Sequence, residues 1–403
     1  MKVYLAGTAL LFAATMHAAS GPVEFGLSEF QAATAKQRWP VKVKTELSLD
    51  PPETFRIEPY TAGGGRVSGG DLRGLMYGLI EASEQIRSLG RLKPTHGVPA
   101  TPLRSVRFVL ASGDMDQPWF SSDGFWRTYF QTLARSRFNR FSLAVPRLPE
   151  PPSRLRWLSQ LAAQYAIDFT LALPDPSSDP ALLRSRLTAI LEACPLIRGI
   201  EMEAGASPIE FYRDAVVRTV ETAGRRVTLD VRNAASRADL IPALNQAALE
   251  TNVPLRLSSP LGCKELSGLP EGACYWELRE AAAAAGQVRE RVADLTSDGS
   301  SGFEIEAPRT EEVSGAQYHD PHELFYWLWG RLSYDVKAPE APPVERPSPP
   351  AAPAPVKPAP PRPASSGAPA PRTPPPTPAT SGTPTPSTTP SNTTPLSTPI
   401  RRQ

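Results

Sequence analysis

The stretch VSGGDLRGLMYGLIEASEQIRSL, residues 67–89, is the most informative part of this chain for its fold. Val67 ends a short strand pattern, Gly69 and Gly70 make a turn, and Asp71 has the side chain that caps a helix start. Apolar residues then recur at helical spacing, so the predicted helix has one mostly apolar face: Leu72, Leu75, Met76, Leu79, Ile80, Ile86 and Leu89. A strand pattern, VRFVLA, follows at 106–111. The stretch therefore predicts a strand–turn–helix unit that leads into a second folded region.

The net charge and the cysteine spacing argue against a nucleic-acid ligand and a metal site. The 403 residues carry a net charge of +2, and no basic run interleaved with aromatic residues occurs, so nucleic acid is not an expected ligand. The three cysteines form no CxxC pair and no paired histidine spacing exists, so we expect no metal site. Cys263 and Cys274 are close in sequence and are candidates for a disulfide in an exported chain. Cys194 comes just before an apolar strand pattern, so we expect it to be buried as a small hydrophobic residue.

The two ends of the chain differ in composition from the rest. Residues 1–20 combine one lysine, an apolar run at 3–16 and small residues at 18–20, which predicts a cleaved secretory signal and a periplasmic or extracellular protein. A membrane anchor is the alternative, but the run is short for a span. Residues 338–403 hold 23 of the 47 prolines and few aliphatic residues, which predicts a disordered, extended tail. A solvated spacer is the expected role, with cell-wall contact as the alternative.

Two folded regions are predicted between these ends. Residues 21–100 suggest a small α/β domain, with a helix at 27–36 and strands at 41–49 and 55–59. Residues 101–337 alternate helical patterns with eight strand patterns, which predicts a compact (β/α)8 barrel. An open doubly wound sheet is the alternative, but the glycine fingerprint that such a fold places after its first strand is missing. The strand patterns lie at 106–111, 140–145, 168–173, 199–204, 227–232, 254–258, 274–278 and 302–306, and the seventh is the weakest. Helical patterns lie at 125–136, 154–165, 180–192, 208–222, 238–249 and 321–334.

Several predicted barrel strands alternate apolar and charged residues, as in GIEMEA, VTLDVR and GFEIEA. Side chains of a strand alternate between its two faces, and the apolar set must face the surrounding helices. The polar set then points into the barrel: Glu201, Glu203, Asp230, Arg256, Glu304 and Glu306, with Arg107 and Arg232. Buried charges need partners or water. We therefore expect either an ionic core that holds the barrel together or a polar pocket at the carboxyl ends of the strands.

Positions near the carboxyl ends of the strands favour the pocket, because barrel enzymes place their chemistry there. Glu203 and Glu306 are the first catalytic candidates by this rule, and Asp230, Arg232 and Glu277 come next. Paired carboxylates suit glycosidic bond cleavage, in which one group protonates the leaving oxygen and the other attacks or activates water.

Three motifs resemble glycoside hydrolases of families 20 (β-hexosaminidases) and 67 (α-glucuronidases). They are the G-D-x-R-G-x-x-Y-G-L pattern at 70–79, ARSRFNRFSL at 134–143, and GFEIEAP at 302–308 with WLWGRLSYD at 327–335. The resemblance implies a small α/β domain before a barrel, a carbohydrate substrate and no cofactor. It implies Glu203 as general acid, whereas Asp230, Glu277 and Glu306 are candidates for the base or nucleophile because of their positions in the strands. Family 20 enzymes carry adjacent Asp and Glu where this chain has Met202 and Glu203.

Further residues are candidates for substrate contacts. Asp116 and Trp119 lie in the loop DMDQPW at 114–119, where the tryptophan is a candidate for stacking on a sugar ring. His319 and His322 flank Asp320 before the last helix, where a helix cap by Asp320 is the alternative to a site. Two functions remain open: an exported hydrolase of polysaccharide fragments, or a non-catalytic carbohydrate-binding or envelope-associated protein. In the second case we expect Arg232 and Arg256 to neutralise the acids, or the cleft to be filled.

Overall fold

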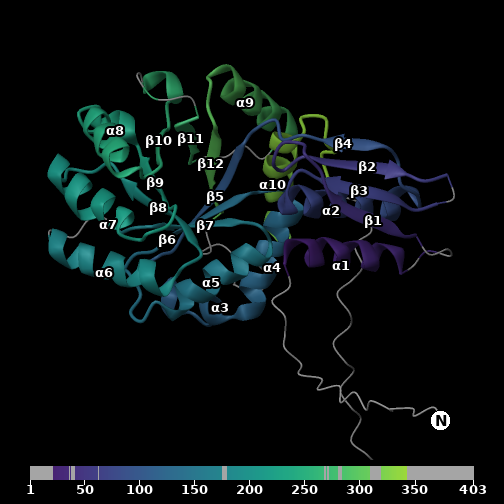
Figure 1. The fold of residues 1–403 in the computed structure, drawn as a ribbon, viewed down its shortest axis with the longest axis horizontal. Helices are drawn as coiled ribbons and strands as arrows, with labels where there is room; N and C mark the ends of the chain where they lie inside the picture. The colour runs from purple at the N-terminus through teal and green to yellow at the C-terminus, as the bar shows by residue number, and fades with distance from the viewer. Residues whose placement is uncertain are drawn as a thin grey trace, which may run out of the picture. The chain divides into compact units, whose positions relative to one another are not determined.

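The computed structural model describes residues 21–35, 37, 41–61, 63–174, 179–266, 269, 272–279, 284–308 and 319–342. The predicted signal segment at 1–20 and the predicted tail beyond residue 342 lie outside these residues. Within them the chain forms a four-stranded sheet with the order β1-β3-β2-β4 and a closed barrel of eight parallel strands (Figure 1). The predicted fold class, a small α/β domain followed by a (β/α)8 barrel, is confirmed.

The small domain is built around residues 67–89, which form a strand end, a turn and a helix. Asp71 caps helix α2, because its carboxylate accepts a hydrogen bond of 2.7 Å from the Gly74 backbone N–H. Gly90 ends the same helix with a φ of 66°, in the left-handed region that glycine adopts without strain. The apolar face of α2 covers the sheet, and α1 packs against α2 (Figure 1). The elements are α1 (Pro22–Thr34), β1 (Val43–Leu47), β2 (Phe55–Pro59), β3 (Gly65–Gly69), α2 (Leu72–Leu89) and β4 (Thr95–Gly97).

All eight predicted barrel strands form, including the weak seventh one. They are β5 (Leu103–Val109), β6 (Arg140–Ala144), β7 (Asp168–Ala172), β8 (Ile197–Glu203), β9 (Thr228–Arg232), β10 (Leu255–Ser259), β11 (Cys274–Leu278) and β12 (Gly302–Glu306). The helices between and after them are α3 (Pro118–Ser121), α4 (Asp123–Arg135), α5 (Ser153–Gln164), α6 (Pro180–Ala193), α7 (Arg218–Glu221), α8 (Leu240–Thr251), α9 (Ala285–Ser297) and α10 (His319–Tyr334). The predicted helix at 208–222 is instead a π-helix, η2 (Phe211–Val217), that continues into α7.

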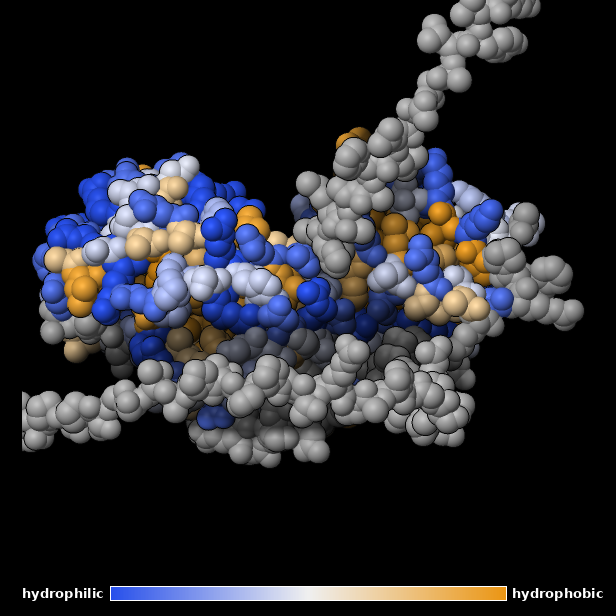
Figure 2. All heavy atoms as spheres, turned by 90° about the horizontal axis from the view of Figure 1, so that it is seen from below, coloured by the Kyte–Doolittle hydropathy of each residue, from blue (hydrophilic) through white to orange (hydrophobic). Residues whose placement is uncertain are grey.

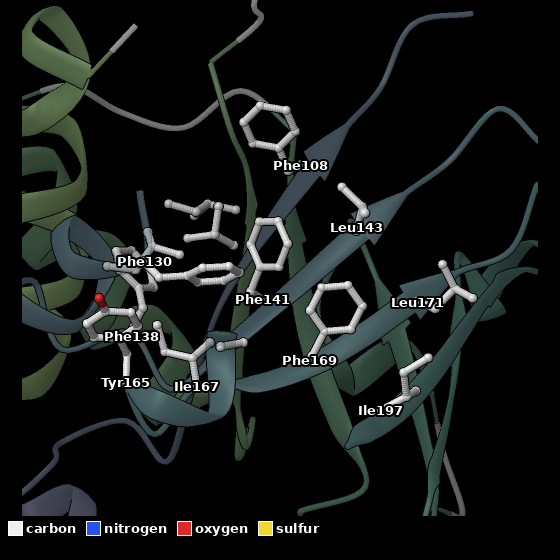
Figure 3. Packing of buried hydrophobic residues seen from close by; sticks show 14 of the residues in the cluster. Phe108, Phe130, Phe138, Phe141, Leu143, Tyr165, Ile167, Phe169, Leu171 and Ile197 are labelled. Carbon is white, nitrogen blue, oxygen red and sulfur yellow. The ribbon is translucent and has the colours of Figure 1, made fainter. Parts of the chain in front are cut away.

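The apolar set of each barrel strand faces outward, as the alternation predicts. Phe108, Phe141 and Phe169 project from three neighbouring strands on the same side of the sheet (Figure 3), with ring centroids 6.3 Å and 5.7 Å apart along the row. The aromatic residues of α4 pack against this row, and the ring of Phe108 lies 5.3 Å from that of Tyr129. The hydrophobic core of the barrel domain therefore lies between strands and helices, which leaves the polar set for the inside of the barrel.

The crossover between β10 and β11 contains no α-helix among its described residues. It has a short 3-10 turn, η4 (Cys263–Glu265), and a disulfide joins Cys263 to Cys274 at the start of β11. Asp298 at the end of α9 accepts hydrogen bonds from the Cys263 backbone N–H and from the Trp276 indole, the latter at 2.7 Å. The disulfide and the Asp298 carboxylate thus hold this loop against β11, at the place where a (β/α)8 barrel usually has a helix.

Glu53, in the turn between β1 and β2, connects the small sheet to the barrel. Its carboxylate pairs with Arg104 at the start of β5 and Arg73 of α2, and accepts a hydrogen bond of 2.8 Å from the Asn139 amide. Its backbone carbonyl accepts a hydrogen bond of 2.6 Å from the hydroxyl of Tyr334 in α10. Burial alone would raise the pKa of Glu53, but the two guanidinium groups outweigh it and lower the pKa to about 2. Glu53 also has a φ of 64°, which these contacts must hold in place.

Replacing Glu53 by Gln should lower the free energy of unfolding by about 3–5 kcal/mol, because two arginines lose their buried counter-charge. The matched control is Glu58→Gln, whose carboxylate is half-exposed and pairs with the exposed Arg66. That change should cost less than about 1 kcal/mol. Urea unfolding followed by tryptophan fluorescence measures both, and equal losses would contradict the role of Glu53.

Candidate functional site

The inside of the barrel is filled by charged side chains from seven of its eight strands. Four arginines and four carboxyl groups face one another there among the described residues: Arg107, Arg140, Arg232, Arg256, Glu201, Asp230, Glu277 and Glu304. All four carboxyl groups are buried, with at most 1% of each side chain exposed. This is the ionic core that the alternation predicted as one of two outcomes.

Arg140 lies at the centre of this ionic core and is not among the predicted inward-facing residues. Its Nη1 donates to Asp230 Oδ1 at 3.0 Å, and its Nη2 lies 3.5 Å from Glu201 and 3.6 Å from Glu304. A Cβ at Gly199 would lie 2.5 Å from the Thr170 hydroxyl and 3.3 Å from Asp230, so the glycine leaves the space in which these groups meet. Arg140 and the buried Tyr275 occupy inward positions of RFSLA and CYWEL, and the period-two pattern would have identified both.

Asp230 and Glu277, two of the four predicted catalytic residues, belong to this core. Asp230 lies 3.0 Å from both Arg140 and Arg256. Glu277 accepts from Arg232 and Ser258 at 2.8 Å each and from the Asn233 backbone N–H, and Arg279 lies 3.4 Å away. Every oxygen of Glu277 is therefore engaged by protein donors. The neutralisation by Arg232 and Arg256 that we expect of a non-catalytic protein is present.

The pKa values of Glu201 and Glu304 shift in opposite directions although both carboxyl groups are buried. Burial raises the pKa of Glu304 to about 7, and the nearby Glu201 carboxylate adds to the shift. Burial also disfavours the charged form of Glu201, but the guanidinium groups of Arg107, Arg232 and Arg140 outweigh it and lower the pKa to about 2. Glu304 accepts a hydrogen bond of 2.9 Å from Ser105, deep in the barrel, so its proton is held away from solvent.

A cavity of about 420 Å³ opens at the carboxyl ends of β5–β8. Glu203 lines it as the last residue of β8, and its side chain is 34% exposed. Arg107 and Glu201 also line the cavity, joined by a 2.7 Å ion pair. A larger hollow of about 570 Å³ lies at the opposite rim, between the turns that lead into β9 and β10. Because barrel sites form at the carboxyl ends of strands, the smaller cavity is the candidate functional site.

Arg279 connects Glu203 to the ionic core. Its Nη2 lies 3.4 Å from Glu203 Oε1 and 3.4 Å from Glu277 Oε2. The two carboxylate oxygens can therefore be no farther apart than twice that distance, so their separation does not exceed the upper end of the span of about 5–10 Å that glycosidase carboxylate pairs show. Arg279 itself occupies the position between them, and half of its side chain is exposed.

The other predicted site residues are more scattered. Glu306 ends β12 and is half-buried, opposite Arg107 in the register, but it is not among the residues that line the cavity. Trp119 packs at 4.9 Å against Phe125 and at 6.1 Å against Phe108, within the aromatic cluster rather than in the cavity wall. Asp116 pairs at 3.2 Å with the exposed Arg147. His322 is a half-buried residue of α10, and the side chain of His319 lies outside the described residues.

The described residues show neither a metal-binding cluster nor a membrane helix. No group of three or more His, Cys, Asp or Glu side chains in this part of the chain is arranged to hold a metal ion. None of its helices is both long enough and apolar enough to cross a bilayer. Hydrophilic residues are spread over much of the visible barrel face, with hydrophobic ones between them (Figure 2).

Glu304→Gln should remove one source of pH dependence in stability. The pKa of Glu304 rises on folding from the ordinary 4.5, so its contribution to stability is complete below pH 4.5 and is lost as the pH rises towards 7. Relative to the variant, the wild type should lose at most about 1.4 kcal/mol for each pH unit over that interval. The Gln carbonyl can still accept from Ser105. Urea unfolding at pH 5, 6, 7 and 8 tests this, and parallel curves for the two proteins would contradict it.

Comparison with known proteins supports the architecture. No family model and no curated protein matches this chain. A GH138 enzyme targeting pectin rhamnogalacturonan II is similar with a TM-score of 0.63 and 14% identity, over 79% of this chain and 50% of that one. The GH115 4-O-methyl-α-glucuronidase BtGH115A, with specificity for decorated arabinogalactans, has a TM-score of 0.51 and 12% identity, over 79% and 56%. The Clostridium perfringens enzyme CpGH89, in complex with GlcNAc-α-1,4-galactose, has a TM-score of 0.52 and 9% identity, over 78% and 48%.

These likenesses show a glycoside-hydrolase-like fold. The chain spans about half the length of each of these structures. They belong to families 138, 115 and 89 and not to families 20 and 67, which the motifs resemble.

Proposed function

We propose that this protein is an exported carbohydrate-binding protein that keeps a glycoside-hydrolase scaffold without its hydrolytic chemistry. The observation that carries the proposal is the occupation of the inner acids by arginines. Asp230 and Glu277 are fully buried, and each already contacts two guanidinium groups. Hydrolysis needs two carboxyl groups that face one open cleft, and the cavity at β5–β8 offers only Glu203 with an exposed carboxylate among its lining residues.

The cavity supports carbohydrate binding because charged groups line it together with partly exposed apolar residues such as Val109 and Pro146. Glu203 presents acceptor oxygens, and Arg107 uses its Nε for Glu201 while its terminal nitrogens have no hydrogen-bond partner among the described residues. Sugar hydroxyls both donate and accept hydrogen bonds, so such a pair suits two neighbouring hydroxyls. The similar solved structures concern pectin, arabinogalactan and an amino-sugar disaccharide, which agrees with a carbohydrate ligand.

Export and descent are parts of the same proposal. The signal-like residues 1–20 and the Cys263–Cys274 disulfide support export, because disulfides persist mainly in oxidising compartments. The G-D-x-R-G-x-x-Y-G-L motif, whose Asp71 caps α2, supports the proposal that this protein derives from a glycoside hydrolase of family 20 or 67. Contact of the tail with a cell wall is a proposal that rests on composition.

Hydrolysis is the second candidate, and the proximity of Glu203 to Glu277 favours it. In that case Arg279 must leave its position between the carboxylates, Glu203 must protonate the leaving oxygen, and Glu277 must attack the anomeric carbon before water releases the sugar.

A glycan microarray and a panel of aryl glycosides and glucuronides separate the two candidates. We expect the wild type to bind an oligosaccharide on the array and to show no turnover. Glu203→Gln should weaken that binding about tenfold, because it removes a charged acceptor. The exposed Glu210→Gln, a little further along the chain, should leave binding unchanged.

Turnover by the wild type that disappears in Glu203→Gln would overturn the non-catalytic proposal and establish the hydrolase. Absence of binding to every glycan would overturn the proposed function.

A further inference from the structure

We propose that Arg279 positions the carboxylate of Glu203 for sugar binding in the cavity at the carboxyl ends of β5–β8. The inference rests on the proposed carbohydrate-binding function and adds a residue that acts on the sugar without contacting it. Three observations carry it. Arg279 is not among the residues that line the cavity, it holds one carboxylate oxygen of Glu203, and the buried Glu277 holds Arg279 in turn.

The two carboxylate oxygens of Glu203 have different surroundings. Oε1 accepts a hydrogen bond of 3.4 Å from Arg279 Nη2, whereas Oε2 has no hydrogen-bond partner among the described residues. Glu203 lines the cavity, and its side chain is partly exposed. The oxygen that Arg279 leaves free can therefore accept from a sugar hydroxyl, and its charge makes that hydrogen bond a strong one.

Arg279 is itself held by a carboxylate that other contacts fix in place. The same Nη2 donates to Glu277 Oε2 at 3.4 Å. Glu277 is buried, and it accepts further hydrogen bonds of 2.8 Å each from Arg232 and from the Ser258 hydroxyl. The ionic core therefore sets the position of Nη2, and through it the position of Glu203 Oε1.

An ordered Glu203 should bind a sugar more tightly than a free one. Glu203 is the last residue of β8, where its long side chain reaches solvent. Such a side chain loses conformational freedom when a ligand fixes it, and a contact that orders it beforehand reduces this cost of binding. Arg279 does not compete with the sugar, because it engages Oε1 and leaves Oε2 free.

A purely structural role for Arg279 predicts a different outcome. Its side chain is 53% exposed, and pairs between exposed charges contribute little to stability. Arg218 provides a matched control, because its side chain is 48% exposed and lies 3.5 Å from both Glu221 and Glu250. It does not line the cavity. If Arg279 acts through Glu203, the two arginines should differ in sugar binding and not in stability.

Calorimetry on the full chain tests the inference, with the array oligosaccharide that gives the strongest wild-type signal as the probe. Arg279→Gln should bind it about three- to tenfold more weakly, because the sugar must then order Glu203 itself. Arg279→Lys should bind within about twofold of the wild type, since both contacts of Arg279 go through one nitrogen that an ammonium group can replace. Arg218→Gln should bind as the wild type does.

A double-mutant cycle assigns the effect to Glu203. In a Glu203→Gln background, Arg279→Gln should change binding by less than about twofold, because the carboxylate that it positions is gone. Urea unfolding should give Arg279→Gln and Arg218→Gln the same small loss of stability, below about 1 kcal/mol.

Unchanged or tighter binding by Arg279→Gln would overturn the inference, as would a Lys variant that binds as weakly as the Gln variant. The same loss with and without the Glu203 carboxylate, or a loss of stability far above that of Arg218→Gln, would also overturn it. Any of these results in a protein that binds an array oligosaccharide leaves the proposed function standing, whereas a blank array removes both.

Discussion

The barrel depends on the pairing of arginines with carboxyl groups along its axis. Strands that alternate charged and apolar residues can close into a barrel only if the charged face finds partners inside, because an unpaired buried charge is far too costly. Arg140 provides the central contact, with Asp230 at 3.0 Å and Glu201 and Glu304 slightly farther away. Burial and the nearby Glu201 carboxylate raise the pKa of Glu304 to about 7 even though arginines surround it.

The same pairing limits what the site can do chemically. A carboxylate that holds a barrel together is surrounded by donors, and Glu277 and Asp230 have little freedom to meet a substrate. Glu203 differs because it ends its strand and lies in a cavity wall. The outcome is a cavity whose lining has one partly exposed acid and an arginine close to it, which suits recognition of a sugar better than cleavage.

The strand patterns predicted which residues turn inward but not how they pair. Period-two alternation placed Glu201, Asp230 and Glu304 inside the barrel, because the two faces of a strand are fixed by its geometry. In RFSLA the inward positions hold Arg140, Ser142 and Ala144, so only one charged residue indicates which face points inward. Glu53 was also missed, because a turn residue before a strand has no pattern that indicates a partner such as Arg104 on another domain. The three-residue strand β4 is too short for periodicity to identify.

By itself, the sequence determined the order of strands and helices, the capped helix α2 and the inward direction of the charged side chains, because these depend on neighbours close in the chain. The tertiary structure decided which acids are neutralised and which one remains available. Glu203 ends β8 and Glu277 lies in β11, with two whole strands between them in the chain, yet both lie 3.4 Å from the same Arg279 nitrogen. Only the closing of the barrel sets such distances, and charges act on one another through space rather than along the chain.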